Sequence, residues 1–78
     1  MDAVDVKHKI EEGLPGSRAD VTGTDAHFSA TVTAGVFAGK TMIQQHQLVY
    51  ATLRDEMASQ QVHALALKTQ LPTETETP

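Results

Sequence analysis

Four histidines are the residues of this 78-residue chain best suited to chemistry: His8, His27, His46 and His63. A neutral imidazole binds transition metals, and near neutral pH it also exchanges protons. The intervals between these residues are long, so no two have the short spacing of a local metal-binding motif. Any metal site built from them must therefore be assembled by the fold or shared with another molecule.

Other groups that could catalyse a reaction or bind metal are scarce. The chain contains no cysteine, which excludes disulfides, a cysteine nucleophile and any thiolate ligand from this chain. None of its serines lies in a Gly-x-Ser-x-Gly elbow. The segment 35–39 is bounded by glycines and precedes Lys40, but it lacks the spacing of a phosphate-binding P-loop. The sequence therefore indicates that the protein is not an enzyme.

The charge balance restricts the possible partners. The net charge is −4, with six Lys and Arg against ten Asp and Glu. Affinity for nucleic acid depends on clustered basic side chains, so this balance disfavours a nucleic-acid partner. No apolar run approaches the ~20 residues of a membrane helix, and the acidic segment 1–5 does not resemble a secretory signal. We expect a cytoplasmic protein whose free chain is a monomer or weak homodimer.

A single small domain must position these histidines. Residues 2–12 predict a helix, because apolar residues recur every three or four positions after the potential cap Asp2. Residues 18–23 and 27–34 predict a β-hairpin, since from Phe28 onward apolar side chains alternate with Ser and Thr. One face of the second strand is therefore expected in the core and the other in water.

The second half of the chain predicts a helical segment and a third strand. Residues 41–58 form the helical segment, with a possible break near 44–46. Its apolar face is predicted to carry Ile43, Tyr50, Leu53 and Met57, extended by Val49. Residues 62–68 predict the strand. The order αββααβ predicts a two-layer α+β domain over residues 1–72, with helices on one face of a three-stranded mixed sheet. Residues 73–78 are predicted to be a disordered tail.

The predicted strands place two of the histidines. His27 is expected on the water-exposed face, whereas His63 shares alternation with Leu65 and Leu67 and is expected in the core or at its rim. Strict alternation puts His27 and His63 on opposite faces, so that they could meet only at the rim of the sheet. On spacing alone, His63 is more often structural than a ligand. His8 is expected on the surface, and His46 on the surface or between helices.

Several runs of residues resemble the BolA family. They are Ala26-His27-Phe28, Phe37-Ala38-Gly39-Lys40, Gln45-His46-Gln47-Leu48-Val49-Tyr50, Leu53-Arg54-Asp55-Glu56-Met57 and Val62-His63-Ala64-Leu65-Ala66-Leu67. The agreement extends from about residue 3 to Pro72, and the short first loop is similar to the smaller bacterial branch. The resemblance implies a fold like the class II KH domain, which has the same αββααβ order.

The resemblance also implies a function. BolA-like proteins pair with monothiol glutaredoxins that carry a Cys-Gly-Phe-Ser site, and the complex holds a [2Fe-2S] cluster in iron–sulfur trafficking or in iron and redox regulation. Glutaredoxin and glutathione supply the thiolates, so no cofactor is expected for the isolated chain. The family's metal-ligating histidine falls on His63, and imidazole can replace thiolate on one iron. In the first loop Thr24 is a poor ligand, which leaves His27 as the candidate for a second one.

Three further residues within these runs are candidates for partner binding: Lys40, His46 and Tyr50. Two alternatives to the glutaredoxin hypothesis stay open. One is a KH-like or helix-turn-helix transcriptional regulator that binds nucleic acid through residues 40–58, although glutamines flank His46 where the family often has arginines. The other is a small scaffold in which His63 is only structural.

Overall fold

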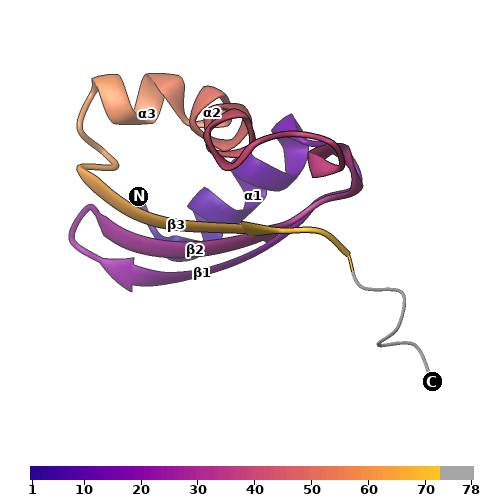
Figure 1. Ribbon diagram of the computed structural model, residues 1–78. Helices are drawn as coiled ribbons and strands as arrows, with labels where there is room; N and C mark the ends of the chain where they lie inside the picture. Colours follow the sequence, from indigo (N-terminus) through magenta and orange to yellow (C-terminus); the bar gives the residue numbers. More distant parts are fainter. Residues whose placement is uncertain (73–78) are drawn as a thin grey trace.

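The computed structural model describes residues 1–72, and the segment 73–78, predicted to be a tail, lies outside the described residues. The elements are α1 (Ala3–Gly13), β1 (Arg18–Thr24), β2 (His27–Thr33), the 3-10 turn η1 (Gly35–Phe37), α2 (Met42–Thr52), α3 (Arg54–Ala58) and β3 (Ala64–Gln70). The strand order is β1-β2-β3, with the first pair antiparallel and the second parallel. The helices cover one face of the sheet (Figure 1). The predicted two-layer α+β fold is confirmed.

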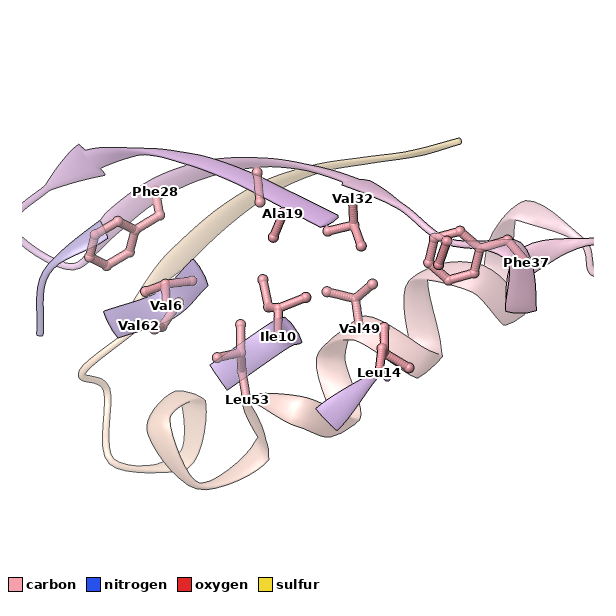
Figure 2. Packing of buried hydrophobic residues seen from close by; sticks show 12 residues of the cluster. Val6, Ile10, Leu14, Ala19, Phe28, Val32, Phe37, Val49, Leu53 and Val62 are labelled. Carbon is pink, nitrogen blue, oxygen red and sulfur yellow. The ribbon is translucent and has the colours of Figure 1, made fainter. Parts of the chain in front are cut away.

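The core lies between the helices and the inner face of β2. Phe28, Ala30 and Val32 are buried, whereas the residues between them are exposed or half-buried, as the alternation predicts. Figure 2 shows Ile10 of α1 and Val49 of α2 pointing toward Val32. The water-exposed side of β2 therefore faces away from every described helix.

The helical segment breaks at a different place from the one predicted. The turn at 44–46 is intact, because Thr41 and Gln44 form a capping box at the start of α2. The break falls at Leu53, whose N–H bonds to the carbonyl of Tyr50 at 3.0 Å before α3 begins. The side chain of Leu53 is fully buried, so the break tightens the chain around the core.

The prediction that Ile43 belongs to the apolar face of α2 is wrong, because this side chain is 71% exposed. Burial on α2 centres on Val49, which lies six residues later and therefore about 120° away around the helix axis. A hydrophobic residue in the first turn of α2 thus projects into solvent. No helix among residues 1–72 is long and apolar enough to cross a membrane.

An ion pair on α1 covers part of the edge strand β1. The Nζ of Lys7 donates to Glu11 Oε2 at 2.5 Å and to the carbonyl of Ala19 at 3.1 Å. The N–H of Ala19 donates to the same Glu11 oxygen at 3.0 Å. Both backbone groups of one edge residue are therefore bonded by side chains of the helix. We refer to Lys7, Glu11 and their two bonds to Ala19 as the β1 clasp.

The β1 clasp should make stability depend on pH. The hydrogen bond from Lys7, and then the one from Ala19, hold the pKa of Glu11 below its ordinary value of 4.5. This stabilisation is complete above that value, and it is lost as the pH falls through the lower pKa of the folded state. Thermal unfolding from pH 7 to pH 3 should show a smaller acid-side loss of stability for Glu11→Gln than for the wild type. Parallel curves would contradict a role for the clasp.

Candidate metal centre

His27 and His63 lie together at one end of the sheet. Their ring centroids are 5.5 Å apart, and the ring planes meet at 63°. Both residues are exposed. The prediction that they could meet only at the rim of the sheet agrees with this arrangement, and of the two placements expected for His63, core or rim, the rim is the one observed. We refer to these two residues as the histidine pair.

The strand boundary explains how the rings meet. β3 begins at Ala64, two residues later than predicted, so His63 lies in the connection before the strand and does not follow its alternation. The N–H of Val62 bonds to the carbonyl of Glu56 at 3.1 Å, and its side chain is buried in the core. The chain therefore turns at Val62, and His63 is free to face the same end of the sheet as His27.

The carbonyl group of Ala26 connects the hairpin turn before His27 to the segment that contains His63. Ala26 O accepts hydrogen bonds from the N–H of His63 at 2.8 Å and from the N–H of Ala64 at 3.0 Å. Ala26 and Asp25 are the two turn residues of the β-hairpin, with φ of 67° and 56°. Positive φ at both positions is the geometry of a type I′ turn, which matches the twist of the flanking strands. The turn thus joins β2 directly to the start of β3.

The side chain of His27 is oriented by the same turn. Its Nδ1 lies 2.8 Å from the carbonyl of Asp25. A carbonyl oxygen only accepts hydrogen bonds, so Nδ1 carries the proton in this contact and the Nε2 of the neutral ring has a free lone pair. Metal-binding histidines commonly have this arrangement, in which a backbone acceptor fixes the tautomer and the ring direction.

The spacing of the two rings fits shared coordination of one metal ion. Two imidazole nitrogens bound to one tetrahedral metal at 2.0–2.1 Å are about 3.4 Å apart, which puts the ring centroids about 5 Å apart. The observed 5.5 Å is close to this value. Among residues 1–72, no group of three or more His, Cys, Asp or Glu could hold a metal ion. The pair can supply two ligands, and the others must come from outside the described part of the chain.

An open hollow with a volume of about 850 Å³ is lined by residues that precede the two histidines in the chain, although neither histidine lines it. Its walls are the start of α1, the hairpin turn with Gly23 and Thr24, and the α3–β3 connection with Gln60 and Gln61. Gln60 has φ of 64°, so a left-handed residue occurs in each of the two loops. Sequence reasoning considered Thr24 only as an unsuitable ligand, and did not identify these residues as walls of one hollow.

The structure places the predicted partner-binding residues elsewhere. Lys40 is exposed and precedes α2. The side chain of Gln45 on α2 donates a hydrogen bond to the carbonyl of Lys40 and accepts one from Thr69 near the end of β3. The histidine pair lies at the beginning of β2 and β3, so the length of the sheet separates it from Lys40. His46 and Tyr50 are half-buried on α2, with ring centroids 6.3 Å apart. His8 is exposed on α1.

Comparison with known proteins bears on the family. The model of the BolA-like protein family matches residues 4–74. The chain belongs to the BolA family. The solved structure of a bolA protein homologue from Coxiella burnetii is 42% identical and superimposes with a TM-score of 0.86, covering 97% of each chain. The resemblance inferred from the sequence motifs is therefore confirmed.

Two curated relatives show how far the similarity to BolA proteins extends. BolA-like protein 1 of Bos taurus is 37% identical over 77 residues, which cover 86% of this chain and 56% of the relative. The DNA-binding transcriptional regulator BolA of Vibrio cholerae is 45% identical over 47 residues, which cover 60% of this chain and 43% of the relative. The chain thus spans about half the length of the curated relatives it matches.

Proposed function

We propose that this BolA-family chain is a non-enzymatic partner of a monothiol glutaredoxin with a Cys-Gly-Phe-Ser site. It would supply imidazole ligands to a [2Fe-2S] cluster bridging the two proteins, in iron–sulfur trafficking or in iron and redox regulation. The observation that carries the proposal is the histidine pair, whose exposed rings lie 5.5 Å apart. The N–H of His63 donates a hydrogen bond to the carbonyl of Ala26, the residue before His27.

The ligand chemistry of the chain supports a shared cluster over an internal one. Without cysteine, this chain can offer an iron–sulfur cluster only weaker ligands such as imidazole. The glutaredoxin cysteine and glutathione would provide the thiolates. Two histidines on one iron of a [2Fe-2S] cluster raise its reduction potential, as in Rieske centres. The chain's own contribution is to hold both rings at the solvent-exposed rim, with the hairpin turn fixing their separation.

The proposal predicts a new spectrum when the proteins meet. Titrating this chain into glutathione-containing, [2Fe-2S]-loaded glutaredoxin should change the visible absorption and circular dichroism until about one equivalent has been added. Replacement of a thiolate by imidazole on one iron is the physical cause. The apo-glutaredoxin, titrated in parallel, is the control. An unchanged cluster spectrum with a folded chain would reject cluster bridging with this partner.

Nucleic-acid binding is the second candidate, favoured by the similarity to the DNA-binding regulator of Vibrio cholerae. Two of the six Lys and Arg residues form ion pairs with carboxylates: Lys7 with Glu11, and Lys9 with Glu56 at 3.2 Å. Together with the net charge of −4, this weakens any phosphate-binding surface. The two functions separate by salt dependence, since affinity for DNA falls steeply with added salt.

A further inference from the structure

We propose that the outer edge of β3 pairs with β3 of a second copy of this chain. The two strands would run antiparallel about a two-fold axis at Leu67, which would join two three-stranded sheets into one of six strands. The inference does not depend on the proposed glutaredoxin partnership, because it rests on the backbone and on the surface of β3.

The hydrogen bonds of β3 show which of its backbone groups face outward. The N–H of Ala64 and the carbonyl of Gln70 both bond toward the β2 side of the strand. Because backbone groups alternate along a strand, those of Leu65, Leu67 and Thr69 point to the opposite edge. None of the described residues bonds to them, and no described strand lies beyond β3 (Figure 1). Such an unpaired edge is a template for another strand.

The other edge of the sheet is partly closed. On β1 the outward-facing N–H and carbonyl of Ala19 are bonded by the β1 clasp. A second copy could therefore not lie along the full length of β1. If β1 of one copy paired with β3 of the next, the contact would repeat from copy to copy and form a ring or a filament rather than a dimer. Pairing of β3 with β3 is complete after two copies. The β1 clasp opposes the alternative, in which β1 pairs with β3.

The sequence of β3 is self-complementary in this register. With the axis at Leu67, Leu65 of one copy faces Thr69 of the other, and these outward-facing residues exchange hydrogen bonds. Lys68 is the only charged residue of the strand, and it falls opposite Ala66 of the second copy. Side chains in such a non-hydrogen-bonded pair are especially close, with Cα atoms about 4.5 Å apart. No like charges lie directly opposite each other. The two Lys68 side chains are diagonal neighbours on the outer face, about 7–8 Å apart, where both are exposed and can diverge into solvent.

Apolar surface at the edge adds to the pairing. Leu65 and Leu67 point toward the helix layer but are only partly buried, although they pack against the core. A second β3 beside them would cover more of their surface. The two His63 residues would lie eight positions apart along the paired strands, or about 26 Å. Each histidine pair would thus remain at its own end of the dimer.

Charge substitutions at Ala66 test the register, because this side chain is exposed and lies outside the core. Sedimentation velocity from micromolar to millimolar concentration should show the wild type moving from 8.4 kDa toward twice that mass. At low salt, Ala66→Glu should tighten the dimer about fivefold, because two new carboxylates face two lysines, and Ala66→Lys should weaken it by a similar factor. Lys68→Glu added to Ala66→Lys should restore dimerisation.

The matched controls are Thr22→Glu and Thr22→Lys, on the exposed outer face of β1, which should not change the dimer constant. Amide exchange gives a second readout, since Leu65, Leu67 and Thr69 should exchange more slowly as concentration rises while Val21 should not. A monomer at every concentration would overturn the proposal. The proposal would also be overturned if Ala66→Glu and Ala66→Lys changed the dimer constant equally, or if the Thr22 variants changed it as much as the Ala66 variants. Assemblies larger than two copies would overturn it as well.

Discussion

The His63→Ala variant is expected to remain folded and to lose the shared cluster. His63 is exposed, and no described residue hydrogen-bonds to its ring, so the free energy of unfolding should change by no more than about 0.5 kcal/mol. Affinity for the bridging cluster should fall at least about 100-fold, because even indirect partners of a metal ligand contribute 10–100-fold. A structural histidine would behave in the opposite way, with a large loss of stability.

His27→Ala tests whether the second ring also binds iron. If both rings are ligands, this variant should alter the cluster spectrum as well. The double variant should then lose little more than His63→Ala alone, since residues of one site act together. If His63 is the only ligand, His27→Ala should leave the spectrum unchanged. The hydrogen bond between His27 and Asp25 favours the first outcome, because it orients Nε2 for binding.

Two measurements made on the same samples separate these outcomes. Urea denaturation reports stability, and visible circular dichroism with loaded glutaredoxin reports cluster binding. His8→Ala is the matched control, because His8 is exposed on α1 and belongs neither to the histidine pair nor to the candidate partner-binding residues. An unfolded His63→Ala variant would support the scaffold hypothesis. A folded variant with the wild-type spectrum, or an equal loss in His8→Ala, would exclude His63 as the ligand.

Much of the fold could be predicted because local patterns encode it. The alternation from Phe28 to Val32 fixed the inner and outer faces of β2, and glycine and proline separated the elements. The break at Leu53 could not be predicted, because it depends on burial against α1 and the sheet. Ile43 was misplaced for a related reason, since only the packed helices determine which face of α2 is covered.

The site was only partly predictable. His27 was placed correctly, because it lies within a regular strand. The proximity of His27 and His63 depends on hydrogen bonds from the N–H groups of His63 and Ala64 to the carbonyl of Ala26, a residue in the left-handed conformation. These bonds join residues far apart in the chain, and no sequence pattern predicts them. The roles of Lys40, His46 and Tyr50 in partner binding stay predictions, as do the iron–sulfur cluster and the similarity to the KH fold.

Gly23→Ala is expected to be the most destabilising single methyl addition at a described glycine. Gly23 has φ of 126°, a backbone conformation that residues with a Cβ atom rarely adopt. An added Cβ would lie 2.2 Å from the carbonyl oxygen of His27 and 2.8 Å from Phe28 Cα. Both are backbone atoms of the facing strand and cannot rotate away. Strain and clash together should cost about 3 kcal/mol, a large part of the stability of so small a domain.

Gly39→Ala separates the two causes. Gly39 has φ of 76°, and no atom lies within 4 Å of its added Cβ, so this variant should cost only about 1 kcal/mol. Urea midpoints at equal m-values give both free energies. Because the clash in Gly23→Ala falls on His27, its NMR signals should also show a displaced histidine pair, whereas Gly39→Ala should leave the pair in place. Equal costs in the two variants would mean that the hairpin yields to the methyl group, and the turn could not then be what holds the two rings together.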